Sequence, residues 1–362
     1  MGALVLHVIT TTDRRGAEVF GVDLSHALAR RGRAVETVAL APGVQAAPLD
    51  VAPLGRRRLA PGTLRALRSR ARAAALVIAH GSTTLPACAI ATAGTGVPFI
   101  YRNIGDPEQW AATRARRIRS GILLRRARAV VALTPAVART LVARYRLASE
   151  RVRAIPRGIP AERFPPADDA ARRQARENFG LPADVPLVVY LGALSPEKNV
   201  GLAVDAVATL PGVHLLVAGD GPERASLERQ SEAAVTGRVL FTGALDTPRQ
   251  ALAAADVVVL PSHTEGLPGV AIEAGLSGRP VVATDVGWVR DIVVDGSTGL
   301  VVPPGSRDAL ASALRRALDD PGRMGTAARA HCLERYELEV VAAAWDSLID
   351  EVLATPSEGG PA

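Results

Sequence analysis

The chain has 362 residues, 48% of them hydrophobic and 22% charged, which is typical of a globular protein long enough to hold two domains with separate cores. Its two cysteines, Cys88 and Cys332, match no metal-ligand spacing and fit a reducing, cytoplasmic environment better than a disulfide scaffold. No apolar run approaches the roughly 18 residues that a membrane-spanning helix needs. We therefore expect a soluble or peripheral protein.

The charge of the chain is divided unevenly along its length. Residues 1–163 carry 27 Lys and Arg against 9 Asp and Glu, a net charge of +18, whereas the remainder carries −11. A genome rich in arginine codons would raise the arginine content of both halves of the chain. The asymmetry therefore favours a polyanionic partner for the first half, such as anionic lipid headgroups, a phosphorylated acceptor or nucleic acid. An ordinary solvated surface is the alternative.

In chain order, short apolar runs predict strands and amphipathic stretches predict helices. The apolar start has no basic segment before it, so we expect a strand there and not a secretory signal. Strands of the first half are expected at Leu4–Ile9, Ala34–Leu40, Leu76–Ala79, Phe99–Tyr101 and Val130–Leu133, with helices at Glu18–Arg31 and Pro135–Tyr145.

The second half repeats this alternation. Its strands are expected at Leu187–Leu191, His214–Ala218, Val239–Thr242, Val257–Pro261, Pro280–Ala283 and Leu300–Val302, with helices over 196–209, 222–235, 247–255, 269–277 and 306–319. Near-continuous Val, Leu and Ile in strands that alternate with helices predict parallel sheets covered on both faces.

Prolines gather between residues 158 and 186 and mark the expected boundary between two domains. We expect an N-terminal domain at 1–165 and a C-terminal domain at 166–340, with a helix over about 340–356 that packs back on the first domain. Two parallel α/β domains imply a cleft at the carboxyl ends of their strands, where ligands of such sheets bind.

The most specific motif runs from Pro261 to Ala274. A strand ends at Pro261 and a helix is expected from about Pro268, so the backbone N–H groups from Gly266 to Gly269 form an anion site at a helix N-terminus. Glu265 lies in the loop, and Glu273 follows eight positions later, about two helical turns on the same face. A strand-to-helix connection with two solvated carboxylates is the alternative.

This motif resembles the Glu-x7-Glu signature of retaining glycosyltransferases with the GT-B fold, in the group known as family 4. Five more segments follow the family's order along nearly the whole chain, at Leu191–Asn199, Ala218–Glu223, Leu240–Gly243, Pro280–Gly287 and Thr298–Pro304. The resemblance implies an α/β protein with two Rossmann-like domains facing across a cleft. It also implies a nucleotide-diphosphate sugar of the UDP or GDP type as donor, with no separate cofactor. The sequence has no Asp-x-Asp metal motif, so we expect metal-independent transfer.

The resemblance assigns the donor site mostly to the second half. Lys198, the only lysine of the chain, corresponds to the cation on the donor diphosphate; a surface lysine without function is the alternative. Glu265 is expected to reach the transferred sugar and Glu273 the ribose. Further donor contacts are expected from Gly243, Gly266, Leu267 and Pro268.

In the first half, Gly16 matches a family loop that approaches the donor phosphates or the acceptor. His80 matches a cleft-facing histidine that contacts sugar or acceptor, and a structural turn residue is the alternative. The family often has arginine where this chain has Ala193, so one diphosphate cation is missing from its usual place. Our hypothesis is that Arg15 or Arg157 supplies this charge across the closed cleft.

The implied function is retaining transfer of a hexose-type sugar from the donor to an acceptor hydroxyl. Lys198 and the N–H groups near Gly266 would stabilise the negative charge that develops on the β-phosphate. The alternative, motivated by Ala193, is a catalytically impaired nucleotide-sugar-binding protein of the same fold. A dinucleotide enzyme is disfavoured because no Gly-x-Gly-x-x-Gly follows the first strand.

Arginines between residues 114 and 128 surround the apolar stretch Ile118–Leu124, and others gather at 56–58 and 65–72. A basic amphipathic helix favours peripheral attachment at the inner face of the plasma membrane, with a lipid-linked or envelope-polysaccharide acceptor. A solvated arginine-rich helix is the alternative. Nucleic acid is not an expected partner, because stacking aromatics and zinc-ligand spacing are both missing.

Overall fold

The computed structural model describes residues 3–45, 47–105, 107 and 113–355. The chain divides into two compact units, one formed by residues 1–159 with 338–362 and the other by residues 160–337. It therefore leaves the first unit after Ile159 and returns to it at Leu338, whereas the sequence-based boundaries lie at 165 and 340.

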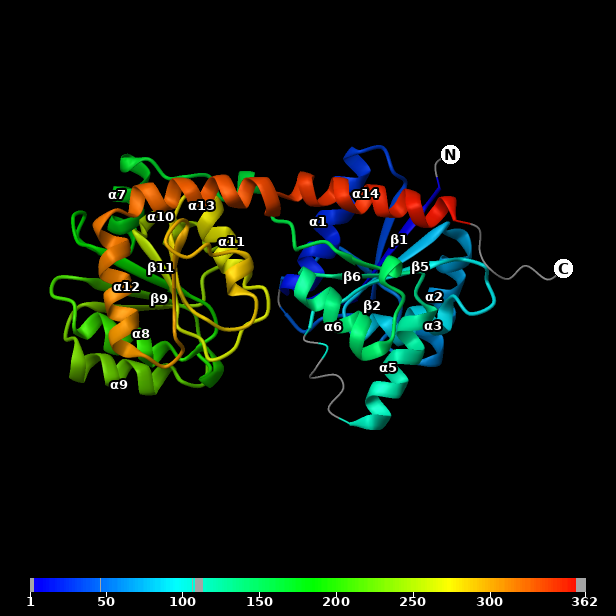
Figure 1. The fold of residues 1–362 in the computed structure, drawn as a ribbon, viewed down its shortest axis with the longest axis horizontal. Coiled ribbons are helices and arrows are strands. Elements are labelled where there is room, and N and C mark those ends of the chain that lie inside the picture. The colour runs from blue at the N-terminus through cyan, green and yellow to red at the C-terminus, as the bar shows by residue number, and fades with distance from the viewer. Residues whose placement is uncertain (1–2, 46, 106, 108–112, 356–362) are drawn as a thin grey trace. The chain divides into compact units, whose positions relative to one another are not determined.

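The first unit is a parallel sheet of seven strands in the order β3-β2-β1-β4-β5-β6-β7. Strands β1, β2, β5 and β6 of this sheet are labelled in Figure 1. The strands are β1 (Val5–Thr11), β2 (Val35–Ala41), β3 (Ala52–Pro53), β4 (Leu76–His80), β5 (Phe99–Arg102), β6 (Ala129–Ala132) and β7 (Val152–Ala154). The helices with described bounds are α1 (Gly16–Arg30), α2 (Pro61–Ala73), α3 (Thr84–Ala91), α5 (Arg114–Arg126), α6 (Pro135–Tyr145) and α14 (Leu338–Ala354).

The main core of this unit lies where α1 and α14 cover the sheet. Phe20, Leu24 and Leu28 recur every four residues along α1 and so form one apolar face, which packs with Ile78 of β4. Trp345 of α14 is fully buried in the same cluster. The helix expected over about 340–356 is thus α14, although residue 356 lies outside the described residues.

The second unit is a parallel sheet of six strands in the order β10-β9-β8-β11-β12-β13. The strands are β8 (Leu187–Leu191), β9 (His214–Ala218), β10 (Val239–Gly243), β11 (Val257–Leu260), β12 (Val281–Thr284) and β13 (Gly299–Val302). The helices are α7 (Asp169–Asn178), α8 (Val200–Ala208), α9 (Arg224–Ala234), α10 (Arg249–Ala254), α11 (Gly269–Leu276), α12 (Arg307–Asp319) and α13 (Pro321–Tyr336).

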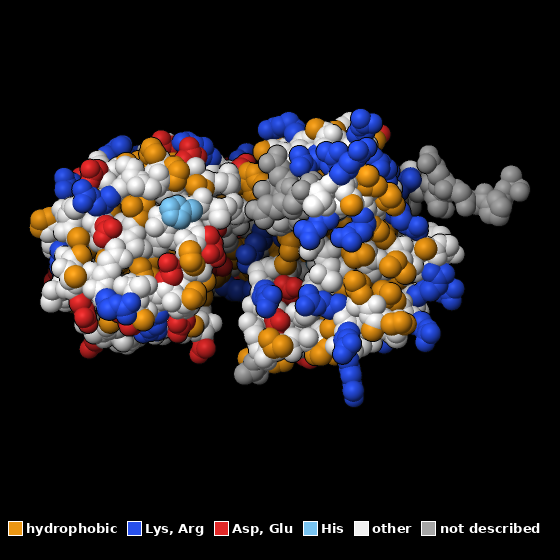
Figure 2. Space-filling view, turned by 90° about the horizontal axis from the view of Figure 1, so that it is seen from below, with side chains coloured by type: hydrophobic (Ala, Val, Ile, Leu, Met, Phe, Trp, Pro, Cys, Tyr) orange, Lys and Arg blue, Asp and Glu red, His pale blue; other side chains and the backbone are white. Residues whose placement is uncertain are grey.

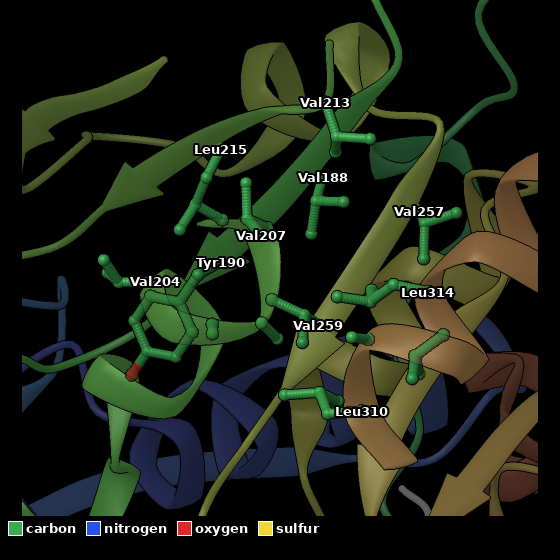
Figure 3. Close-up of a cluster of buried hydrophobic side chains, with 14 of the residues drawn as sticks. Val188, Tyr190, Val204, Val207, Val213, Leu215, Val257, Val259, Leu310 and Leu314 are labelled. Carbon is green, nitrogen blue, oxygen red and sulfur yellow. The ribbon is translucent and has the colours of Figure 1, made fainter. Parts of the chain in front are cut away.

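Leu310 and Leu314 of α12 pack against Val257 and Val259 of β11 in the core of the second unit (Figure 3). Both valines are fully buried, which explains why these strands appear in the sequence as continuous apolar runs.

Every strand expected from the sequence corresponds to a strand of the structure. Two were missed, β3 and β7, because two or three residues are too few to show any periodicity. No helix among the described residues combines the length and apolar character needed to cross a bilayer.

Candidate functional site

The second unit changes the direction of its strand order beside β8. The chain builds outward from β8 through β9 to β10 and then crosses to the other side of β8 to form β11. The loops after β8 and β11 therefore diverge at the carboxyl edge of the sheet, and such a point is where ligands of open α/β sheets bind. Lys198 follows β8 and Glu265 follows β11.

Lys198 and Glu265 form an ion pair, with Lys198 Nζ 2.7 Å from Glu265 Oε1. Ser262 Oγ donates to the same carboxylate oxygen at 2.7 Å. The side chain of Lys198 is 27% exposed and that of Glu265 is 8% exposed. A buried carboxylate thus fixes an accessible ammonium, whose three N–H groups allow it to bind an anion at the same time.

Backbone contacts also bring the two loops together. His263 N donates to Glu197 O at 2.8 Å, and Asn199 Nδ2 donates to Pro261 O at 3.3 Å. Asn199 has a left-handed φ of 49°, a conformation that asparagine tolerates better than most residues. This kink separates a 3₁₀ turn at Pro196–Lys198 from α8, so the helix predicted from residue 196 begins at Val200.

The loop after β9 supports the loop after β8. Gly192 N donates to Ala218 O at 3.0 Å, and Leu194 N donates to Asp220 O at 2.9 Å. A Cβ atom at Gly219 would overlap Gly192 O. The Gly-Asp-Gly sequence at 219–221 therefore serves close backbone packing.

The loop after β12 holds Glu265 from another side. Thr284 Oγ1 donates to Ser262 O at 2.6 Å, and Trp288 N donates to Gly266 O at 3.3 Å. Gly287 has a φ of 57°, and a Cβ atom there would overlap Glu265 O. Ser262 and Gly287 were not predicted as members of the site, because only the folded backbone shows what they contact.

Helix α11 begins at Gly269, with Pro268 as its N-cap. The expectation that two helical turns separate Glu265 from Glu273 is therefore wrong, since residues 265–268 lie in the loop. Gly266 is exposed, Leu267 and Glu273 are half-buried, and Pro268 is buried. Pro268 offers no side-chain acceptor to the first turn of α11, so the N–H groups there can bind an anion.

Gly243 ends β10 and is buried, and its carbonyl accepts a hydrogen bond from Gly219 N at 2.8 Å. Its observed contact is thus with protein backbone, and its contact with a donor stays a prediction.

Gly16, Arg15 and Arg157 lie together in the first unit, where α1 begins. Arg15 is the exposed N-cap of α1, and its Nη2 atom lies 3.9 Å from Asp13 Oδ2. A Cβ atom at Gly16 would come within 2.9 Å of Arg157 Nη1, so glycine allows Arg157 to approach the helix. The backbone N–H groups of Val44 and Gln45 hold the pKa of Asp13 below its ordinary value.

His80 lies inside the first unit and is only 1% exposed. Its ring stacks with that of His7 at 5.4 Å between centroids, and Phe20 and Trp345 also contact it. Burial, followed by the neighbouring His7 and Arg102, lowers the pKa of His80 well below its ordinary value. The expectation of an open, cleft-facing histidine is wrong for this structure, in which the ring is enclosed by core side chains.

Comparisons with known proteins match both halves of the chain. Residues 14–163 match Glycosyltransferase Family 4, and residues 185–320 match Glycosyl transferases group 1. D-inositol 3-phosphate glycosyltransferase of Xylanimonas cellulosilytica is 32% identical over 357 residues, which cover 86% of this chain and 85% of that protein. The chain belongs to the family 4 glycosyltransferases.

Another relative of this glycosyltransferase is alpha-D-kanosaminyltransferase of Streptomyces kanamyceticus, 35% identical over 231 residues. That match covers 61% of this chain and 57% of the relative, so the chain spans little more than half of that protein's length. Anabaena HepE, crystallised with UDP-glucose, superimposes with a TM-score of 0.82 at 23% identity over 96% of this chain and 100% of HepE. This likeness establishes the GT-B fold.

Ala193 lies where, by the family resemblance described above, an arginine often stands. It is exposed in the loop after β8, and its carbonyl accepts a hydrogen bond from Tyr190 Oη at 2.7 Å. Its methyl group brings no positive charge to this loop, where Lys198 is the single cation between β8 and α8.

Proposed function

We propose that this glycosyltransferase moves a hexose-type sugar from a nucleotide-diphosphate sugar to an acceptor hydroxyl, with retention at the anomeric carbon. The observation that supports this most directly is the Lys198–Glu265 pair at the point where the strand order of the second unit reverses. A fixed, accessible ammonium beside a helix N-terminus suits a diphosphate leaving group.

In this proposal the bond between the sugar and the β-phosphate breaks with negative charge developing on the phosphate oxygens. Lys198 Nζ and the backbone N–H groups of Gly266, Leu267 and Gly269 stabilise that charge without having to reorganise. Glu265 positions the ammonium of Lys198. Because it lies beside that ammonium, and so beside the diphosphate, Glu265 also reaches the transferred sugar. The leaving phosphate accepts the proton of the acceptor hydroxyl, and Glu273 binds the ribose.

Thermal unfolding with UDP, GDP, ADP and NAD tests the donor site. HepE was crystallised with UDP-glucose, so UDP is the first nucleotide to try. We expect one nucleoside diphosphate to raise the Tm, and Lys198→Ala to abolish this rise. Glu197→Gln is the matched control because Glu197 precedes Lys198 in the same loop and its carboxylate accepts a hydrogen bond from Ser195 Oγ at 2.6 Å. No rise with any nucleotide would contradict the proposal.

The anomeric configuration of the product, determined by NMR, tests retention.

A second candidate function is nucleotide-sugar binding with impaired transfer, and Ala193 favours it. The loop after β8 then binds the donor through Lys198 alone and stabilises the leaving diphosphate too weakly for turnover. Nucleotide-sugar binding by the unaltered protein, without transfer to a broad acceptor panel, together with transfer by Ala193→Arg, would support this candidate. Turnover by the unaltered protein would exclude it.

We further propose that the first unit binds an anionic membrane surface and takes a lipid-linked or envelope-polysaccharide acceptor. Figure 2 shows arginine side chains (blue) spread over this unit, on the right of the view. On α5, Ile118 is 54% exposed and Ile122 is 56% exposed, one turn apart. A groove of about 690 Å³ between α5 and α6 is lined by Arg117, Arg144 and Arg146.

The arginines of α5 point in all directions around the helix, so charge and apolar side chains are not separated into two faces as the sequence analysis expected. Electrostatic attraction is therefore the larger contribution in this proposal, with the two isoleucines as anchors. Sedimentation with anionic liposomes at low salt tests it. We expect Arg116→Glu/Arg119→Glu to release the protein, and Arg315→Glu/Arg316→Glu on α12 to leave binding unchanged. Failure of the unaltered protein to bind would contradict the proposal.

A further inference from the structure

A groove of about 880 Å³ opens at the amino edge of the sheet in the first unit, opposite the edge at which ligands of such sheets bind. It is lined by Phe99 and Ala129, the first residues of β5 and β6. The last two turns of α14 form one wall through Leu348 and Val352. Each of these strands has four residues, so roughly 13 Å of strand separates the groove from the carboxyl edge. A ligand of this groove is therefore separate from one at the carboxyl edge.

The groove is strongly positive. Five arginines and two glutamates line it, which gives it a net charge of +3. The arginines are Arg125, Arg126, Arg128, Arg151 and Arg153. Glu351 of α14 balances one of them, since Arg153 Nη2 lies 3.1 Å from Glu351 Oε2. A concave surface with this charge concentrates anions.

Two of the arginines also stabilise helix ends. Arg151 Nη2 donates to Arg125 O at 2.8 Å and to Ala127 O at the end of α5. Arg125 Nη2 donates to Tyr145 O, in the last residue of α6, at 2.8 Å. Each helix end carries only about half a negative charge, so the two guanidinium groups exceed what they compensate. Arg126 is exposed, and its side chain forms no hydrogen bond or ion pair with another residue that the structure describes.

The walls of the groove favour a small polyanion over a lipid or a nucleotide. Leu348 and Val352 are buried in the core and so offer little apolar area to an acyl chain. Phe99 is the one aromatic residue among the described residues that line the groove, and its burial leaves no ring face on which a base could stack. Guanidinium groups bind phosphoryl oxygens well, because their N–H groups donate in pairs.

We propose that this groove is a second anion site, which binds a soluble ligand with two or more phosphoryl groups and no large apolar or aromatic part. A single phosphate dianion balances less than the net charge of +3, whereas two linked phosphoryl groups come close to it. Because the groove lies at the amino edge, its ligand acts as an effector and not as a substrate. The proposal does not depend on the proposed function.

Inorganic pyrophosphate is the probe, and calorimetric titration of the full chain measures its affinity at constant pH and ionic strength. The Lys198→Ala background removes the anion site of the second unit. We expect pyrophosphate to bind, and Arg126→Gln/Arg153→Gln to weaken its affinity about tenfold or more. Arg144→Gln is the matched control because Arg144 is an exposed arginine of the α5–α6 groove in the same unit, and it should leave the affinity unchanged.

Glu351→Gln gives a result of the opposite sign. Removal of a carboxylate from the groove should strengthen pyrophosphate binding about two- to fivefold. Unchanged or weaker binding by this variant would overturn the proposal, as would no binding by the parent or equal losses in Arg126→Gln/Arg153→Gln and Arg144→Gln. If the double arginine variant fails to fold, Glu351→Gln decides.

The class of ligand is tested with orthophosphate and geranyl diphosphate. We expect orthophosphate to bind about tenfold or more weakly than pyrophosphate, and geranyl diphosphate to bind no more tightly than pyrophosphate. Equal binding of orthophosphate would overturn the need for two phosphoryl groups. Tighter binding of geranyl diphosphate that is lost in Arg126→Gln/Arg153→Gln would show that a lipid chain is part of the ligand, which would overturn the proposal of a soluble ligand.

Saturation with UDP separates this site from the donor site. In the protein with Lys198 intact, pyrophosphate should still raise the Tm when UDP is saturating, because the two ligands bind at opposite edges. Loss of pyrophosphate binding under UDP would show that the anion occupies the donor site and would overturn the proposal. The titrations of the groove need no nucleotide, so failure of UDP to bind would count against the proposed function alone.

Discussion

Lys198 Nζ lies 2.7 Å from Glu265 Oε1, so the only lysine of the chain is held by a carboxylate 67 residues further on. A double-mutant cycle measures this pairing through the free energy of unfolding, with Lys198→Ala, Glu265→Gln and the double variant. We expect a coupling energy of about 1 kcal/mol, because one partner is buried and the other is not. The exposed Arg290–Asp285 pair is the control and should couple less strongly. Equal coupling energies in the two cycles would show that burial of Glu265 does not strengthen its ion pair with Lys198.

Gly287→Ala should disturb the donor site through the backbone. The new methyl group would meet Glu265 O, and the positive φ adds strain of about 1 kcal/mol. We expect a loss of stability of about 2–3 kcal/mol together with weaker nucleotide binding. Gly296→Ala is the matched control, since Gly296 also has a positive φ but no atom within 4 Å of the added Cβ. Denaturant unfolding and nucleotide titration check both effects, and equal losses in the two variants would refute the clash.

Asp256→Ala should destabilise the second unit by about 3–5 kcal/mol. Arg176 is fully buried and donates to Asp256 Oδ2 at 2.8 Å, while Leu187 N donates to the same oxygen at 2.8 Å. Removing the carboxylate leaves a buried guanidinium without its counter-charge. Denaturant unfolding measures the change, with Asp308→Ala at an exposed position of α12 as the control. A loss below about 1 kcal/mol would mean that the carbonyl partners of Arg176 are sufficient.

The first unit should lose stability in mild acid because of His7. Burial lowers the pKa of His7 from its ordinary value of 6.5 to about 3. Above pH 6.5 the ring is neutral in both the folded and the unfolded chain and contributes nothing. Between pH 6.5 and about 3 only the unfolded chain takes up the proton, so stability falls by about 1.4 kcal/mol per pH unit.

His7→Leu should therefore flatten the pH dependence of the unfolding free energy between pH 6 and 4 by about that slope. His26→Leu, at an exposed position of α1, should leave the slope unchanged. Identical slopes in the wild-type chain and His7→Leu would show that His7 is protonated inside the folded protein.

The sequence predicted the elements of the donor site better than their geometry. The continuous apolar runs of β8 and β11 are visible without a structure, so the loops carrying Lys198 and Glu265 could be located. Their ion pair could not be predicted, because it depends on β8 and β11 being neighbours, and nothing in either strand specifies that pairing. The eight-residue spacing to Glu273 was misinterpreted for a local reason, since the helix begins only at Gly269.

Burial accounts for the other differences. His80 ends a strand in the sequence as a ligand-binding residue would, and only the positions of Phe20 and Trp345 show that its ring is enclosed. Trp345 lies 265 residues after His80 in the sequence, so its contact with His80 could not be predicted from the residues near His80. The groove at the amino edge of the first sheet was overlooked for a similar reason, because its arginines come from two stretches of the sequence and one of its walls from α14.

The return of the chain to the first unit at Leu338 determines how the protein can be divided. Residues 160–337 form a continuous stretch with its own core and are therefore a sensible fragment to express separately. The other part is discontinuous, because α14 completes its core with Trp345 and Ile349. A fragment that stops at residue 159 would expose that apolar surface, so the N-terminal part should be produced with residues 338–354 rejoined through a flexible linker.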